Sequence, residues 1–278
     1  RRKPLKMTKN IIACSLQRSG HNAMIKWLLY QNENVDEFRN WRKSVAMSEA
    51  LKTPNGEKFL SWEKPHGSAS HIFVVEYGDY TGTDIDFPIP IARPHYYRDL
   101  PDSSLLIWNF VDKPVSEIIE LCSPCQEITC AETDPIVVVM LRDWRNYVAS
   151  QIKHREGDGN KGLSIRSRVR TDIFKEYADY FLNESPYYPI LFDAWFSNKE
   201  YRVKICEDLG LHFTDIGKQS VSDFGGGSSF DLKKFDGKAE KMDVLNRYKL
   251  YKDNEEYKKF MEDEEAVELN NRILEKYL

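Results

Sequence analysis

The sequence lacks the features that would place it in a membrane or among the best-known phosphate-binding proteins. No run of about 18 apolar residues is present, so no transmembrane helix is expected. No apolar stretch of the signal-peptide kind precedes the first predicted strand, which favours a cytoplasmic protein. The Walker pattern G-x-x-x-x-G-K-[ST] is also absent. A net charge of −4 argues against a general nucleic-acid-binding protein.

Internal repeats and long low-complexity tracts are missing too, which favours a single domain. With 41% hydrophobic residues in 278, the chain can bury one large core. We expect one domain over residues 7–278, with its core in about 10–211 and a C-terminal part in 212–278. Residues 1–6 are interpreted as a leader or an expression remnant.

Apolar runs alternate with helical patterns along the chain. Strands are predicted at 11–14, 72–75, 105–107, 136–141 and 189–192. Helices are predicted at 23–31, 146–154, 173–183, 198–209 and 255–277. This alternation predicts an α/β fold with a central, mostly parallel β-sheet flanked by helices.

A short apolar run, a tight polar loop and a helical pattern follow one another in NIIACSLQRSGHNAMIKW, near the N-terminus. A strand–loop–helix aims backbone N–H groups and the positive end of a helix dipole at one point, which suits an anion. Gly20 lets the backbone approach closely, Ser19 and Asn22 offer side-chain donors, and Arg18 supplies a positive charge. The QRSGHN loop therefore predicts a cradle for phosphate or sulfate.

A second motif follows about 120 residues later. The continuous apolar run IVVVML has the pattern of a strand buried on both faces of a parallel sheet. Arg142 follows this run, and Ser150 lies eight residues on, about two helical turns into the next element. Such a pair can hold one phosphate from two sides, because the guanidinium forms a forked contact and the hydroxyl a directional one.

With these two motifs, the chain resembles the PAPS-dependent sulfotransferase family. That family has a loop similar to [K/R]-S-G-T-T after its first strand, which holds the 5′-phosphosulfate. Arg18, Ser19 and Gly20 match this loop, while His21 and Asn22 replace its threonines.

The family also has an R-x7-S element after a later buried strand, which holds the 3′-phosphate. Arg142 and Ser150 match this element at the family spacing. The segment ILFDAWFSNKEYRVKICEDLGL resembles the family's late strand with an aromatic–acidic pair and a helix that closes in LGL. The resemblance spans about residues 11–211. It implies a P-loop-like sulfotransferase fold, PAPS as cosubstrate with PAP as product, no required metal, and a nucleotide site completed by 212–278.

The resemblance also implies a reaction, the in-line transfer of SO3 from PAPS to a hydroxyl or amine. By analogy with phosphoryl transfer, positioning and electrostatics should supply most of the rate. Arg18 occupies the place of a catalytic Lys or Arg and is assigned to the leaving phosphate. The alternative is that Arg18 only binds the ground-state anion.

A general base is expected just after the predicted strand at 105–107, by the same resemblance. Cytosolic members carry a His there in T-H-L-P, and VDKP takes that place in this chain. Asp112 is then the leading base, and Lys113 is expected to help orient donor or acceptor. Asp112 could instead cap a helix that Pro114 opens. The other candidate bases are Glu76, Asp79, His66 and His95.

The glycine-rich segment SVSDFGGGSSFD is a candidate nucleotide loop, with an ordinary surface loop as the alternative. Ser228, Ser229 and Phe230 are expected to bind the nucleotide from it. The family's R-K-G segment is absent, and Arg247 in LNRY is the nearest basic candidate. The basic residues upstream of it are Lys233, Lys234, Lys238 and Lys241.

Two further groups of residues allow more than one interpretation. Trp27 and Trp41 could lie near the nucleotide or belong to the core. Cys122, Cys125 and Cys130 could be free or structural thiols, a disulfide, or ligands of a metal, although no second pair with metal-ligand spacing follows.

The acceptor is not specified by the sequence, and a small molecule, a lipid or a carbohydrate would each fit. Predicted loops near 56–67 and 158–170 could shape its pocket, and RSRVR could steer an anionic acceptor or form a solvated face. Two other functions stay open. One is a P-loop-like nucleotide kinase, which the missing Walker lysine disfavours. The other is a non-catalytic module that binds a nucleotide or sulfate.

Overall fold

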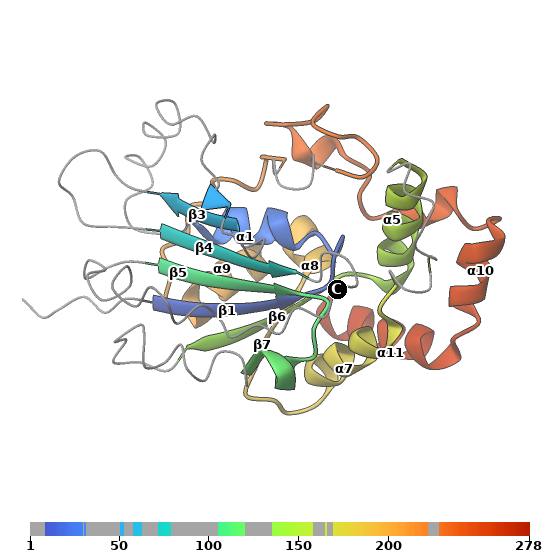
Figure 1. The fold of residues 1–278 in the computed structure, drawn as a ribbon, viewed down its shortest axis with the longest axis horizontal. Helices are drawn as coiled ribbons and strands as arrows, with labels where there is room; N and C mark the ends of the chain where they lie inside the picture. The colour runs from blue at the N-terminus through green and yellow to red at the C-terminus, as the bar shows by residue number, and fades with distance from the viewer. Residues whose placement is uncertain are drawn as a thin grey trace, which may run out of the picture. The chain divides into compact units, whose positions relative to one another are not determined.

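Figure 1 shows the fold in a computed structural model of the chain. The structure describes residues 9–29, 31, 51–52, 58–62, 72–78, 105–119, 135–157, 165, 169–221 and 228–278. The chain divides into two compact units, which we describe separately. The first unit comprises 1–14 and 32–138, and the second comprises 15–31 and 139–278. The expectation of one domain over 7–278 stays a prediction.

Seven strands form one sheet in the order β2-β3-β4-β5-β1-β6-β7. β3 pairs antiparallel with both β2 and β4, whereas β4 and β5 are parallel, and the arrows of β1, β4 and β5 run the same way in Figure 1. The strands are β1 (Lys9–Ser15), β2 (Leu51–Lys52), β3 (Lys58–Trp62), β4 (Ile72–Gly78), β5 (Leu105–Val111), β6 (Ile136–Leu141) and β7 (Tyr188–Leu191).

Burial of consecutive residues explains why two strands have uninterrupted apolar sequences. In β1, Ile11, Ile12, Ala13 and Cys14 are all buried, and the last four residues of β6 are buried as well. A strand covered on both faces needs apolar side chains at every position rather than at alternate ones. The predicted α/β fold, with a mostly parallel sheet flanked by helices, is confirmed.

Helices make up most of the second unit. Figure 1 shows α7 beside α11 and α5 beside α10, and both pairs are in contact. The Trp144 ring of α5 lies 4.6 Å from Phe174 of α7, centroid to centroid. The helices are α1 (His21–Leu29), α5 (Trp144–Gly157), α7 (Thr171–Leu182), α8 (Phe192–Ser197), α9 (Lys199–Asp208), η2 (Ala239–Lys241), η3 (Arg247–Leu250), α10 (Glu255–Met261) and α11 (Glu264–Tyr277).

Besides shifts of a few residues at the ends of other elements, three differences from the prediction have a clear cause. The helix predicted over 255–277 is two helices, because Asp263 accepts a hydrogen bond from the Ala266 N–H at 3.0 Å and caps a new start. The strand predicted to include Phe192 ends one residue earlier, and Phe192 begins α8. The loop predicted near 56–67 contains β3, a strand whose mixed polarity gave no clear period.

The LGL sequence ends α9 in a defined way. Gly210 has a positive φ of 60°. The Leu211 N–H donates to the Cys206 carbonyl at 2.7 Å, and the Gly210 N–H donates to the Glu207 carbonyl at 3.0 Å. This pair of bonds is a Schellman motif, which favours glycine at the left-handed position. No helix in the described part of the chain is both long and apolar enough to cross a membrane.

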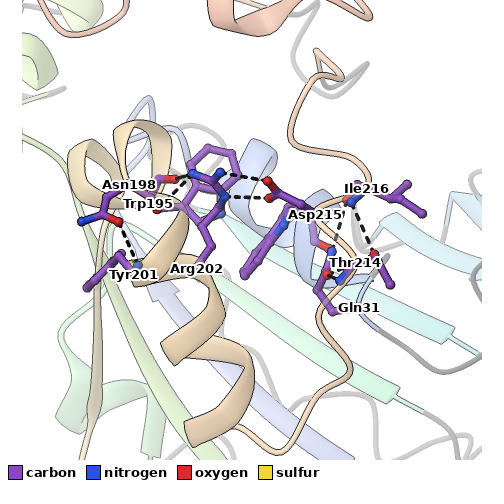
Figure 2. A network of polar contacts seen from close by, with 9 residues as sticks. Gln31, Trp195, Asn198, Tyr201, Arg202, Thr214, Asp215 and Ile216 are labelled. Carbon is purple, nitrogen blue, oxygen red and sulfur yellow. Dashed lines mark hydrogen bonds and ion pairs between the residues drawn. The ribbon is translucent and has the colours of Figure 1, made fainter.

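A buried glutamine joins the end of α1 to the segment after α9 (Figure 2). Gln31 Nε2 donates to the carbonyl of Trp27 at 2.7 Å and to that of Ile216 at 3.2 Å. Its Oε1 accepts from the Thr214 N–H at 2.8 Å and from the Thr214 hydroxyl at 3.2 Å. All polar atoms of this fully buried side chain are therefore satisfied.

A forked ion pair holds the same segment on α9. Arg202 donates to both carboxylate oxygens of Asp215, at 2.6 and 2.9 Å, and to the Trp195 carbonyl at 2.7 Å (Figure 2). Arg202 is buried, so this planar pair is shielded from water and is stronger than an exposed one. The two networks fix α1 against α8 and α9 in the second unit.

Replacing Gln31 with leucine should destabilise the second unit. The substitution removes the donor to the carbonyls of Trp27 and Ile216 and the acceptor of the Thr214 N–H, and we expect a loss of about 3 kcal/mol in the free energy of unfolding. Lys204→Ala removes an exposed pair with Asp208 and should cost less than about 0.5 kcal/mol. Urea denaturation measures both, and a Gln31→Leu variant as stable as Lys204→Ala would contradict the prediction.

Candidate functional site

The loop between β1 and α1 has the backbone that an anion cradle needs. Arg18 and Gly20 have positive φ angles of 67° and 86°. The Ser19 N–H donates to the Leu16 carbonyl at 3.1 Å and closes a turn. The Gly20 carbonyl accepts from the N–H groups of Ala23 and Met24, so α1 starts directly after the loop. The first N–H groups of α1 then have no partner within the helix.

The side chains of this loop differ in how they are bonded. Ser19 is fully buried, and its hydroxyl has no hydrogen-bond partner among the described residues. His21 is buried and its Nδ1 lies 3.2 Å from the Leu16 carbonyl, to which it donates. Asn22 is half-buried and makes no side-chain hydrogen bond within the described ranges. A buried hydroxyl without a hydrogen-bond partner is unfavourable, so the Ser19 hydroxyl is the group of this loop that most favours an external acceptor.

The loop is bonded to α5 within the second unit. Gln151 Nε2 donates to the Gln17 carbonyl at 2.8 Å. Arg18 Nη2 lies 2.7 Å from Nδ1 and 2.8 Å from Nε2 of His154, one helical turn beyond Ser150. The face of α5 that carries Ser150 therefore also contacts the predicted 5′-phosphosulfate loop.

Arg142 is a buried guanidinium without an ionic partner in the described part of the chain. Its Nη2 donates to the Val244 carbonyl, and its guanidinium carbon lies 4.9 Å from the centroid of the Phe192 ring. Its Nε has no hydrogen-bond partner. Burial lowers the pKa of Arg142, although Asp193 and Asp143 act in the opposite direction. A buried charge paired only with a carbonyl and a ring favours an incoming anion.

A second buried guanidinium lies in the same unit. Arg247 donates to Asp231 at 2.5 Å, and its guanidinium carbon lies 4.7 Å from the Phe230 ring centroid. Its pKa is lowered to about 10, first by burial and then by the charge of Arg142. The charges of the two guanidiniums therefore act on each other, while Asp231 pairs with Arg247. The four upstream lysines considered as candidates are all exposed. Among the basic candidates of this segment, Arg247 is therefore the buried one.

The serines predicted to bind the nucleotide have different environments. The hydroxyls of Ser150 and Ser229 lie 3.2 Å apart, which brings the R-x7-S serine to the C-terminal segment. The Ser228 hydroxyl accepts from the N–H groups of Phe230 and Asp231, both at 3.2 Å, and so stabilises a turn. Half of the glycine-rich segment, 222–227, lies outside the described residues.

Two buried carboxyl groups flank Arg142 without forming an ion pair with it. The Asp143 N–H donates to Asp193 at 2.7 Å. Asp143 itself accepts from Arg145 at 2.9 Å and from the amides of Asn146 and Asn270 at 2.7 and 2.8 Å. Burial raises the pKa of Asp193 to about 6, and the charge of Arg142 opposes this rise.

The leading base candidate belongs to the first unit. Asp112 follows β5 and has a positive φ of 60°, a strained backbone for a non-glycine residue and one that is frequent at functional sites. Lys113 forms an ion pair with Glu117, four residues on. The Ile118 N–H donates to the Pro114 carbonyl at 3.1 Å, so a helix does begin here.

Several predicted residues gain no role from the structure. Trp27 is fully buried, its ring 6.0 Å from that of Trp195, and it belongs to the core. Glu76 lies in β4 opposite Asn109 of β5. Outside the described residues lie Asp79, His66, His95, Trp41, Cys122, Cys125 and Cys130.

Three residues that contact the site were not among the predicted site residues. Phe192 contacts both phosphate motifs: its ring lies under Arg142, and a Cβ added to Gly20 would come within 2.4 Å of it. His154 contacts Arg18, and Asp193 bonds the residue after Arg142. One signal pointed to Phe192 and Asp193, because ligands of α/β sheets bind at the carboxyl ends of strands and both residues directly follow β7.

Comparisons with known proteins add no assignment. No protein-family model matches this chain, and no match to a curated protein was found. Among the described residues, no group of three or more His, Cys, Asp or Glu side chains is arranged to hold a metal ion.

Anion binding at Arg142 should weaken as the pH rises through about 6, because Asp193 then becomes charged close to the guanidinium. Sulfate is a suitable probe because it does not titrate near neutrality, unlike phosphate with its second pKa of about 6. We expect sulfate affinity to fall by about tenfold from the acidic to the alkaline side of this pKa. Asp193→Asn should remove the pH dependence in titration calorimetry, and an unchanged profile would contradict this assignment.

The Asp193 carboxyl also determines how the free energy of unfolding changes with pH. The pKa of Asp193 in the folded protein lies above the ordinary value of 3.8. The free energy of unfolding should therefore decrease as the pH rises from 3.8 to about 6. The Asp193→Asn variant should lack this part of the pH dependence when unfolding is followed by urea titration.

Proposed function

We propose that this protein is a PAPS-dependent sulfotransferase. The observation that carries the proposal is the pair of buried guanidiniums, Arg142 and Arg247, in the same unit as a loop whose buried Ser19 hydroxyl has no partner among the described residues. The loop and Arg142 both contact the Phe192 ring, so two anion-binding elements lie close together. A ligand with two separate phosphate groups would satisfy both.

The residues divide naturally between the two phosphates of PAPS. Arg18, Ser19, Gly20, His21 and Asn22 would hold the 5′-phosphosulfate, using the loop's backbone N–H groups and the Ser19 hydroxyl. The 3′-phosphate would be held by Arg142, Ser150, Ser229 and Arg247. Phe230 would border this site beneath Arg247, and Ser228 would support it by shaping the turn.

The reaction follows from this division of roles. The acceptor oxygen or nitrogen attacks the sulfur and forms a new bond to it, while the bond from sulfur to the phosphate oxygen breaks. PAP leaves with the electron pair, and the Arg18 guanidinium stabilises the charge that develops on the leaving phosphate. The resemblance, rather than the geometry, assigns the proton of the acceptor to the Asp112 carboxylate and an orienting role to Lys113.

The acceptor is proposed only as a class: a hydroxyl or amine of a small molecule, a lipid or a carbohydrate. In this scheme the enzyme acts in the cytoplasm and needs no metal, since the positive charge at the leaving phosphate comes from guanidiniums and backbone N–H groups.

The nucleotide preference tests the proposal. PAP should bind more tightly than ATP or ADP, and Arg142→Ala should weaken PAP binding about 100-fold because a charge-assisted contact to a buried phosphate is lost. Arg272→Ala, which removes an exposed arginine of α11, is the control and should leave PAP binding unchanged. Titration calorimetry measures all three nucleotides. Equal binding of ATP and PAP by the wild-type protein would favour a nucleotide kinase instead.

The proposed base predicts a separation of binding from catalysis. Asp112→Asn should lower kcat by about 100-fold or more and leave PAP affinity within about twofold of the wild type. The exposed residue Asp172 provides the control, since Asp172→Asn should change neither value. Transfer is measured with labelled PAPS and a panel of acceptors. Unchanged transfer by Asp112→Asn would exclude this base, and PAP binding without transfer to any acceptor would favour a non-catalytic module.

A further inference from the structure

One aromatic ring contacts both of the anion-binding elements in the second unit. A Cβ added to Gly20 would come within 2.4 Å of Cδ2 and Cε2 of Phe192, so the ring edge packs directly on the loop backbone. The guanidinium carbon of Arg142 lies 4.9 Å from the centroid of the same ring. A cation over an aromatic face is attracted by the ring quadrupole, which fixes the guanidinium relative to the ring.

The ring has little freedom to move by itself. Phe192 is 4% exposed. Its ring packs on Trp195 at 5.5 Å and stacks on Phe196 at 5.8 Å. Trp195 in turn packs edge-on against Trp27 of α1, the helix that follows the loop. A displacement of the loop or of α1 is therefore transmitted to the ring and to the guanidinium above it.

We propose that Phe192 is a positioning residue that couples the two phosphate-binding elements, so that binding of one phosphate orders the site for the other. The inference rests on the proposed function, because it assigns the two elements to two groups of one ligand. The ring holds Arg142 in an orientation that leaves its Nε without a protein partner. Gly20 is required because any side chain at that position would displace the ring.

The coupling is measured with four nucleotides that differ only in their phosphates: PAP, adenosine 3′-monophosphate, adenosine 5′-monophosphate and adenosine. Each dissociation constant gives the gain in affinity over adenosine. The coupling factor is the gain from both phosphates together, divided by the product of the gains from the 3′- and the 5′-phosphate alone. In the wild-type protein this factor should be well above one. Phe192→Leu should reduce it by about tenfold while each single phosphate keeps most of its effect.

Phe181→Leu is the matched control, since it removes a fully buried ring of α7 that packs on Tyr277 of α11. It should leave the coupling factor unchanged, which separates positioning from a general loss of aromatic packing. Phe192→Met keeps most of the side-chain volume and should show the same loss of coupling as Phe192→Leu, because the ring face is absent in both.

A ligand-free measurement tests the contact itself. Gly20→Ala and Gly237→Ala both place a side chain at a positive φ, 86° and 78°, but only the Cβ at Gly20 would meet another atom. Gly20→Ala should lower the denaturation midpoint further than Gly237→Ala, and Phe192→Leu should remove most of that difference. An equal effect of Gly20→Ala with and without Phe192 would overturn the proposal.

The nucleotide results separate the two hypotheses. PAP binding with an unchanged coupling factor in Phe192→Leu and Phe192→Met would overturn the role of Phe192 and leave the proposed function standing. Absence of PAP binding by the wild-type protein would overturn the proposed function and the coupling together.

Discussion

The guanidinium of Arg142 is buried at the carboxyl end of β6, and its charge explains much of the arrangement around it. A charge removed from water needs compensation. Here the protein supplies a carbonyl that accepts a hydrogen bond, an aromatic face, and two carboxyl groups whose charges act on Arg142 without forming an ion pair with it. Asp143 is instead bonded to Arg145, Asn146 and Asn270. In the proposed function a phosphate supplies the remaining compensation, and Arg247 contributes a second buried guanidinium.

The loop before α1 complements this guanidinium through its backbone. Positive φ angles at Arg18 and Gly20 and the start of α1 at His21 shape this turn, and the buried Ser19 hydroxyl lies within it. The loop is held against α5 through Gln17 and Gln151, and against α8 through the Phe192 ring. The same aromatic ring that requires glycine in the loop also orients the arginine after β6.

Short-range signals in the sequence predicted the local parts of this site. Uninterrupted apolar runs predicted β1 and β6 because both strands are buried on both faces. The end of α9 at LGL came from the family resemblance, and the structure adds its physical reason, a left-handed cap at Gly210. The break between α10 and α11 was missed because the helical period continues past Asp263. β3 was missed because its sequence, KFLSW, gives no usable alternation.

The sequence alone determined the α/β fold, the strand–loop–helix at QRSGHN and the positions of Arg142 and Ser150 in their elements. These depend on periodicity and on backbone conformations that each residue type allows, so they can be derived from neighbouring residues. Only the tertiary structure decided that Arg142 has no ion pair within the described part of the chain, that Ser150 meets Ser229, and that Phe192 contacts both Gly20 and Arg142. Such contacts join residues far apart in the chain, and their existence depends on how the helices pack, which no local pattern records.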